Sequence, residues 1–215
     1  MTETNPKTVA LLGATGSVGG QYARAALDAG FSLRALARDI TKLSVADRPA
    51  VTAIQGDATS IDDVAQLIDG ADVVVSCVGN PNKTTHIMAV TANNVLEAAA
   101  LQAVPPRCIF ISSIGAGDSS WLIGKMMQVV GGRSGFADYE AADLRIRTET
   151  QVPVTLVRPY GLTDKDGKGV YKATTKVPVT FALPIARADL AKFLLDATTD
   201  PQWDGPKGVQ LTGVR

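Results

Sequence analysis

Three glycines near the start of the chain have the spacing of a phosphate-binding turn. Gly13, Gly16 and Gly19 follow directly after the apolar run 9–12, and a helical pattern begins at once. A buried strand that ends in such a turn presents free backbone N–H groups to a pyrophosphate. The first glycine allows the tight turn, the second admits the phosphate, and the third lets helix and strand pack closely. The pattern therefore predicts a dinucleotide site.

The elements that must hold this turn follow from the pattern of apolar residues, in which runs of strand length alternate with segments of helical period. The expected strands are 9–12, 31–37, 51–55, 73–77, 107–112, 154–157, 169–174 and 209–212. The expected helices are 17–29, 61–68, 85–101, 137–148 and 187–197. Strands joined through helices form parallel crossovers, so we expect an α/β fold with a doubly wound parallel sheet in three layers. The 215 residues suit a single domain, with a cofactor-binding core over 8–160 and a small substrate-side portion over 161–215.

Composition narrows the class of protein. Hydrophobic residues make up 46% of the chain, and the formal net charge is zero. No basic stripe indicates nucleic acid as a partner, and no apolar run is long enough to span a membrane. Cys77 and Cys108 fit buried free thiols of a reducing compartment, and together with the single histidine, His86, they show no metal-ligand spacing. We expect a cytoplasmic monomer or homodimer that binds a small molecule and no metal.

Six motifs, the glycine turn among them, follow the expected strands or lie in the last helix. They are Gly-Ala-Thr-Gly-x-x-Gly at 13–19, Ala-Arg-Asp at 37–39, Gly-Asp at 56–57, Ser-Ser at 112–113, Val-Arg-Pro-Tyr-Gly-Leu at 157–162 and Ala-Asp-Leu-Ala at 188–191. Together they resemble the short-chain dehydrogenase/reductase superfamily, and in particular its atypical NAD(P)H-binding branch of NmrA-like proteins and biliverdin IXβ/flavin reductase. The similarity covers about residues 8 to 198. It implies a Rossmann-like fold and a bound nicotinamide cofactor.

The resemblance also implies which residues contact that cofactor, at the ends of successive strands. The expected contacts are Gly13, Thr15, Gly16, Ser17 and Val18 at the pyrophosphate, Arg38 at the adenosine ribose, Asp57 and Ala58 at the adenine, Cys77, Val78 and Gly79 at the ribose side, Ser112 at the end of the fifth strand, and Pro159 toward the nicotinamide. For Asp57 a turn or helix-cap role gives the same pattern.

Arg38 decides which cofactor is expected. A guanidinium grips the adenosine 2′-phosphate of NADP in a bidentate way, whereas an NAD site places a carboxylate there to accept from the ribose hydroxyl. Asp39 follows Arg38 immediately and leaves the NAD alternative open. We predict NADP (NADPH).

The catalytic residues depart from the usual pattern of the superfamily. Its members pair a serine at the end of strand five with Tyr-x-x-x-Lys, in which the lysine lowers the tyrosine pKa and holds the nicotinamide ribose. Ser113 fits the serine, but Tyr139 follows 26 residues later, and Asp143 stands where the lysine is expected. The usual carbonyl-reduction machinery is therefore absent. Ser113, Tyr139 and Tyr160 are the candidate catalytic residues, and Tyr160 is equally compatible with a core or rim position.

Two functions fit this combination. The first is an NADPH-dependent reductase that transfers hydride to a conjugated, hydrophobic or aromatic acceptor such as a flavin, bilin, quinone or enone, for which water can supply the proton. The second is a catalytically silent regulator of NmrA-like type that senses the cofactor without turning it over. Space above the nicotinamide separates the two, since a sensor needs none.

Four further features of the sequence have more than one interpretation. The apolar segment 117–133 is a buried helix, a lid over a hydrophobic substrate or a dimer contact, and the segment 163–169 is a closing loop or a surface turn. His86 either opens a helix at the surface or donates a proton near neutral pH. Asn94 lies in the helix 85–101 and either faces solvent or takes part in the site.

Overall fold

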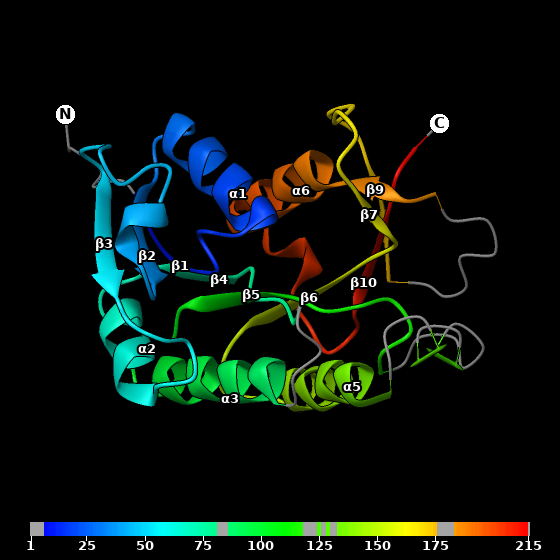
Figure 1. Ribbon diagram of the computed structural model, residues 1–215. Coiled ribbons are helices and arrows are strands. Elements are labelled where there is room, and N and C mark those ends of the chain that lie inside the picture. Colours follow the sequence, from blue (N-terminus) through cyan, green and yellow to red (C-terminus); the bar gives the residue numbers. More distant parts are fainter. Residues whose placement is uncertain are drawn as a thin grey trace.

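A parallel-dominated sheet runs through the middle of the protein, and helices cover both of its faces (Figure 1). The computed structural model describes residues 7–80, 86–117, 124–125, 128–129, 133–175 and 183–214. Within these ranges the main sheet has the strand order β3-β2-β1-β4-β5-β6-β10-β8. Its strands are β1 (Thr8–Leu12), β2 (Ser32–Ala37), β3 (Val51–Gln55), β4 (Val73–Ser76), β5 (Arg107–Ile111), β6 (Val154–Pro159), β8 (Lys172–Thr174) and β10 (Val209–Thr212).

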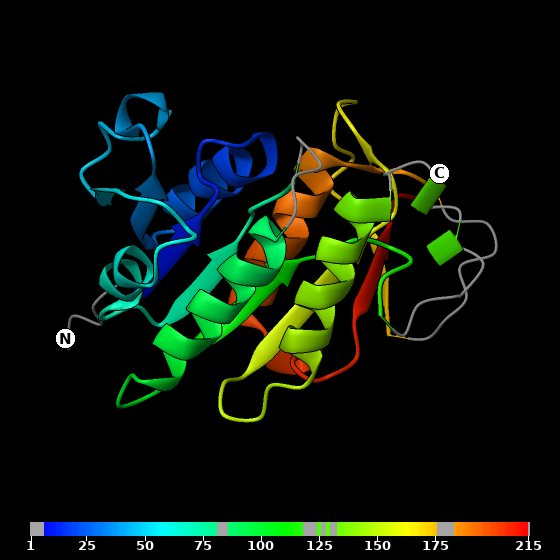
Figure 2. The same cartoon turned by 60° about the horizontal axis from the view of Figure 1, so that its bottom comes forward.

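The helices form two outer layers. Helices α1 (Ser17–Asp28) and α6 (Arg187–Thr199) lie on one face of the sheet, and α2 (Ile61–Ile68), α3 (Ile87–Ala100) and α5 (Arg133–Arg147) lie on the other (Figure 1). Figure 2 shows α3 and α5 side by side on that second face. Short 3₁₀ turns, η1 (Ile40–Lys42) and η2 (Pro201–Trp203), follow β2 and α6.

The alternation of side chains along the central strands builds a core on each face. In β1, Val9 and Leu11 pack toward α1 and α6, whereas Ala10 and Leu12 pack toward α2 and α3, and all four are fully buried. A strand covered on both faces must be apolar throughout, which is why these strands are recognisable as continuous runs in the sequence. The predicted three-layer α/β fold is confirmed.

The C-terminal part differs from the expected alternation. The strand expected over 169–174 is limited to β8, which pairs antiparallel with β10 at the sheet edge. A second, two-stranded sheet joins β7 (Leu162–Thr163) to β9 (Ile185–Ala186). Strands of two residues carry no periodic signal, so the sequence did not predict them. Most of the apolar segment 117–133 lies outside the described residues.

Among the described residues no helix combines the length and apolarity that a membrane crossing requires.

Candidate cofactor and active site

The glycine turn after β1 is fixed by close backbone contacts. Gly13 has a φ of +77°, and a Cβ atom there would lie 2.7 Å from the carbonyl carbon of Cys77. A Cβ atom on Gly19 would overlap the carbonyl oxygen of Gly13. Both neighbours are backbone atoms that cannot move aside, so these two positions require glycine. The turn therefore packs directly against the end of β4.

The N-terminus of α1 is open toward solvent. Its N-cap residue is Gly16, no side chain caps it, and its first turn holds no acidic residue. Thr15, Gly16 and Ser17 are exposed, and Val18 is half-buried. The backbone N–H groups of this turn are available to an anion, and the helix dipole favours negative charge there. A dinucleotide pyrophosphate fits this cradle.

The strand order places the cradle where ligands bind in such folds. The strands run outward from β1 to β3 on one side and from β4 to β10 on the other. Ligands of open α/β sheets bind at the carboxyl ends of the strands where the order reverses. The residues expected to contact the cofactor all lie at or just after the carboxyl ends of β1 to β6.

The carboxyl ends of β2 and β3 carry Arg38 and Asp57. Arg38 is exposed, and Asp57 is half-buried. The backbone N–H and the hydroxyl of Thr59 both donate to Asp57 Oδ1 over 2.8 Å. These hydrogen bonds lower the pKa of the Asp57 carboxyl, and the positive charge of Arg38 lowers it further. The carboxylate is thus ionised and partly engaged in its own turn.

A buried amide holds the neighbouring residue of this loop. Asn94 is 7% exposed, and its Nδ2 donates to the carbonyl oxygen of Ala58 over 3.2 Å. Asp63 accepts the backbone N–H of Asp57 over 2.8 Å. Asn94 therefore does not face solvent. It fixes the loop that we expect at the adenine.

Tyr139 lies beside the end of β4. Its hydroxyl oxygen accepts the backbone N–H of Asn80 over 3.4 Å and would lie 3.9 Å from a Cβ atom on Gly79. The ring is half-buried, and burial raises the pKa of its phenol. The negative charge of the nearby Asp138 carboxylate also raises this pKa. The phenol is therefore neutral at physiological pH and retains a proton to donate.

Asp138 ties Tyr139 to two other elements. This carboxylate is 3% exposed and accepts the side-chain amide of Asn80 over 2.9 Å. It also accepts the backbone N–H groups of Met88 and Ala89, over 2.9 and 3.0 Å, and so caps α3 from the neighbouring helix. The adjacent residues Asp138 and Tyr139 thus hold both the side chain and the backbone of Asn80. Sequence reasoning missed Asn80 and Asp138, because their partners lie on other elements.

His86 begins α3 as its N-cap residue, with a φ of +73° and an exposed side chain. Its own side chain makes no capping hydrogen bond, since the N–H groups of the first turn are accepted by Asp138.

Asp143, which stands at the expected lysine position, is part of a buried ion pair. Arg158 Nε and Nη2 donate to its two carboxylate oxygens over 2.8 and 2.7 Å, and both side chains are fully buried. Arg147 Nε lies 3.0 Å from the same carboxylate, and the Ser112 hydroxyl donates to it over 3.2 Å. The carboxylate is turned toward β6. The carboxylate that raises the pKa of the Tyr139 phenol is the adjacent Asp138.

Two glycines make room for this ion pair. A Cβ atom on Gly117 would overlap Asp143 Oδ1, and one on Gly208 would overlap the Arg158 guanidinium. The pair is thus enclosed between the segment after β5 and the segment before β10. Its position joins α5 to the carboxyl end of the sheet.

The remaining candidate residues lie around β5 and β6. The Ser113 hydroxyl is half-buried and donates to the carbonyl oxygen of Ile114 over 3.2 Å. Pro159 is buried, and Tyr160 is half-buried. The backbone of Tyr160 bridges two strands, since its N–H donates to Leu211 and its carbonyl accepts from Ile185.

The segment 163–169 is anchored by α6. Asp189 is 4% exposed and accepts the backbone N–H groups of Lys168 and Gly169 over 3.1 and 2.8 Å. Arg187 pairs with Asp164 on the same segment. The aspartate of the Ala-Asp-Leu-Ala motif therefore serves to fix this loop.

The family model for NAD(P)H-binding proteins matches residues 13–201, which is most of the chain. The chain belongs to the NAD(P)H-binding family. The match begins at the glycine turn and ends just beyond α6, so it spans the residues that follow strands β1 to β6.

Solved structures of NAD(P)H-binding and related proteins share the fold. The anaerobillin reductase ChuY from Escherichia coli O157:H7 is 22% identical, with a TM-score of 0.80 over 96% of this chain and 97% of that one. The oxidoreductase ylbE from Lactococcus lactis is 19% identical, with a TM-score of 0.81 over 97% and 91%. A short-chain dehydrogenase/reductase from Veillonella parvula, in complex with NADP, is 18% identical, with a TM-score of 0.79 over 96% and 94%. The predicted NAD(P)H-binding family is confirmed by the family model, and these structures show that its fold is shared.

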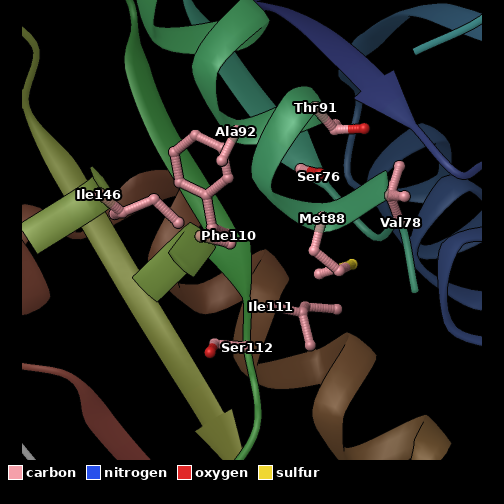
Figure 3. A pocket seen from close by; sticks show the side chains of 10 residues that line it. Ser76, Val78, Met88, Thr91, Ala92, Phe110, Ile111, Ser112 and Ile146 are labelled. Atoms are coloured by element: carbon pink, nitrogen blue, oxygen red, sulfur yellow. The ribbon is translucent and has the colours of Figure 1, made fainter. Parts of the chain in front are cut away.

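A small cavity lies between the sheet and helices α3 and α5 of this NAD(P)H-binding fold (Figure 3). Its volume is about 10 Å³, which admits one water molecule and no substrate. The residues that line it are Ser76, Val78, Met88, Thr91, Ala92, Phe110, Ile111, Ser112, Ala142 and Ile146. This cavity is therefore too small to hold an acceptor.

Proposed function

We propose that this protein is an NADPH-dependent reductase that transfers hydride to a conjugated acceptor. The observation that carries the proposal is the enclosure of Asp143 by Arg158, with both side chains fully buried. Asp143, which stands at the expected lysine position, is therefore held in the protein interior. It neither lowers the pKa of Tyr139 nor reaches a ribose hydroxyl. A cofactor cradle without the tyrosine–lysine couple suits an acceptor that needs little acid assistance.

The cofactor side of the proposal rests on Arg38. Bound NADPH would supply the hydride, and the exposed Arg38 guanidinium would hold the adenosine 2′-phosphate. The open first turn of α1 would bind the pyrophosphate, and Asn94 would keep the loop at Asp57 and Ala58 in place beside the adenine. These residues bind and orient the cofactor.

Tyr139 and Ser113 are the proposed polar contacts to the acceptor. Because its pKa is raised, the Tyr139 phenol would donate a hydrogen bond without becoming a phenolate. Asp138 and Asn80 would keep its oxygen at the end of β4. A conjugated acceptor spreads the charge that hydride transfer creates, so a neutral donor and water suffice. Among conjugated acceptors a bilin is favoured, because one neighbour of the same fold is an anaerobillin reductase.

The test is NADPH consumption with purified protein against biliverdin, FMN, a quinone and an enone. We expect turnover with at least one acceptor, measured at 340 nm, and a dissociation constant for NADPH below that for NADH. NADPH binding without turnover of any acceptor would contradict the reductase and favour the sensing role. The Ser113→Ala variant separates substrate contact from cofactor support, because a loss of kcat with unchanged NADPH affinity assigns Ser113 to the acceptor.

A further inference from the structure

Asp39 directly follows Arg38 and so lies beside the position at which a dinucleotide fold of the NAD type holds its ribose carboxylate. It follows the third glycine of the turn, Gly19, by 20 residues, and a carboxylate at about that distance accepts from the ribose 2′-hydroxyl. It comes two residues after β2, which pairs with β1 in a register that places Leu36 beside Leu12. Asp39 is therefore next to the phosphate cradle. The sequence alone left its effect on cofactor choice undecided.

The structure shows that this carboxylate has other partners. Asp39 Oδ1 accepts the Thr41 hydroxyl over 2.6 Å and the Thr41 backbone N–H over 3.1 Å. Its Oδ2 lies 3.4 Å from Lys42 Nζ. The carboxylate thus caps η1 and points along its own turn. Arg38, directly before it, is exposed.

The next strand end repeats the same arrangement. Asp57 follows β3, and its Oδ1 accepts both the backbone N–H and the hydroxyl of Thr59. Each aspartate is therefore held by a threonine two residues later, and the positive charge of Arg38 acts on Asp57. Of these two aspartates only Asp39 adjoins the expected ribose position, so Thr59 offers a matched comparison for Thr41.

We propose that Thr41 is a specificity-determining residue that favours NADPH by holding the Asp39 carboxylate in the cap of η1. This inference rests on the proposed NADPH preference. A carboxylate turned toward the ribose would accept from the free 2′-hydroxyl of NADH and would repel the 2′-phosphate of NADPH. Because Thr41 and Lys42 hold the Asp39 carboxylate, this carboxylate neither accepts from the 2′-hydroxyl nor repels the 2′-phosphate. Arg38 is then the charged group presented to the ribose. Thr41 acts through Asp39 and is a positioning residue.

The experiment compares Thr41→Val with Thr59→Val in the full-length protein, with the dissociation constants of NADH and NADPH measured by calorimetry. Valine has nearly the volume of threonine and lacks the hydroxyl that makes the shortest contact with Asp39. We expect Thr41→Val to tighten NADH by about 3- to 10-fold, the range of one net hydrogen bond, with NADPH unchanged or weaker. Thr59→Val should leave the ratio of the two constants unchanged.

Two further measurements make the result decisive. The Thr41 hydroxyl is the largest contribution that lowers the pKa of the Asp39 carboxyl, so an NMR titration of Thr41→Val should show this pKa rising toward its ordinary value. Adding Asp39→Asn to Thr41→Val should remove the gain in NADH affinity. An unchanged Asp39 pKa, an unchanged NADH constant, or the same gain in Thr59→Val would each overturn the proposal.

Failure of the NADPH preference itself has a different signature. In that case the unsubstituted protein binds NADH as tightly as NADPH, and Arg38→Ala weakens both cofactors equally. If the unsubstituted protein prefers NADPH and Thr41→Val leaves the ratio of the constants unchanged, the preference stands and the role of Thr41 is refuted.

Discussion

Two arginine–aspartate pairs make the same bidentate contact in different surroundings. One lies at the amino ends of the central strands, and the other lies at their carboxyl ends. At the amino end of β5, Arg107 donates to both carboxylate oxygens of Asp204 over 2.7 and 2.8 Å, and each side chain keeps 19% of its surface exposed. At the carboxyl end of β6, Arg158 and Asp143 are fully buried. The first pair ties β5 to the turn after η2. The second lies next to the residues that we expect at the cofactor and acceptor, since Ser112 donates to Asp143.

The difference shows how this fold separates stability from function. Ligands bind at the carboxyl ends of the strands, so a pair at the amino end stabilises the fold without touching the site. We expect the Arg158–Asp143 pair to do both, because Ser112, an expected cofactor contact, donates to Asp143 and Gly117 lies directly against it. Substitutions at the two ends should therefore affect stability and binding in different proportions.

The largest effect is expected for Asp143→Asn. It deprives the buried Arg158 guanidinium of the Asp143 charge, and breaking a buried pair in this way costs about 3–5 kcal/mol of unfolding free energy. Urea denaturation measures this loss. The double variant Asp143→Leu with Arg158→Met should be more stable than Asp143→Asn, because it removes the buried Arg158 charge together with its partner. If Asp143→Asn unfolds at the same urea concentration as the unsubstituted protein, the pair has no structural importance.

The next effect concerns binding at the carboxyl end. Arg38→Ala should weaken NADPH by about 10- to 100-fold through loss of a charge-assisted contact to the 2′-phosphate, and it should leave NADH nearly unchanged. Fluorescence titration with each cofactor measures the two constants. Because Arg38 is exposed, the melting temperature should stay the same.

At the amino end, Asp204→Asn should lower the unfolding free energy by about 2 kcal/mol, since the pair is partly exposed and hydrogen bonds to charged groups contribute in that range. Its NADPH dissociation constant should be unchanged. A loss of NADPH affinity comparable to that of Arg38→Ala would contradict the separation between the two ends of the sheet.

The smallest effect is expected for Tyr139→Phe, which should lower kcat/KM for the acceptor by about 5- to 10-fold, as for one lost hydrogen bond. The phenol donates in its protonated form, which persists below its pKa. Since burial raises that pKa above its usual value of about 10, the activity due to Tyr139 should not decline between pH 6 and 9. A decline with an inflection near pH 8 that vanishes in Tyr139→Phe would show an activated phenolate instead.

Much of the fold was predictable because its signals are local or periodic. The strand–turn–helix at 9–28, the continuous apolar runs of the central strands and the last helix are all close to their expected bounds. The antiparallel β8 and the short strands β7 and β9 were not predicted, because an edge strand or a two-residue pair depends on its neighbour and not on its own pattern. An Asp-x-Thr signal at 39–41 and at 57–59 was present in the sequence and indicates a side-chain-capped turn.

The sequence by itself determined the glycine turn after β1, because residues adjacent in the chain set its backbone and Gly13 and Gly19 admit no side chain. It also determined that a lysine is missing four residues after Tyr139. Only the tertiary structure decided what the carboxylates do. Asp143 pairs with a residue 15 positions away and Asp138 with one 58 positions away, on elements that packing alone brings together. A carboxylate has the same sequence signature whether it binds a ligand or caps a helix, and its role follows from the donors that folding places around it.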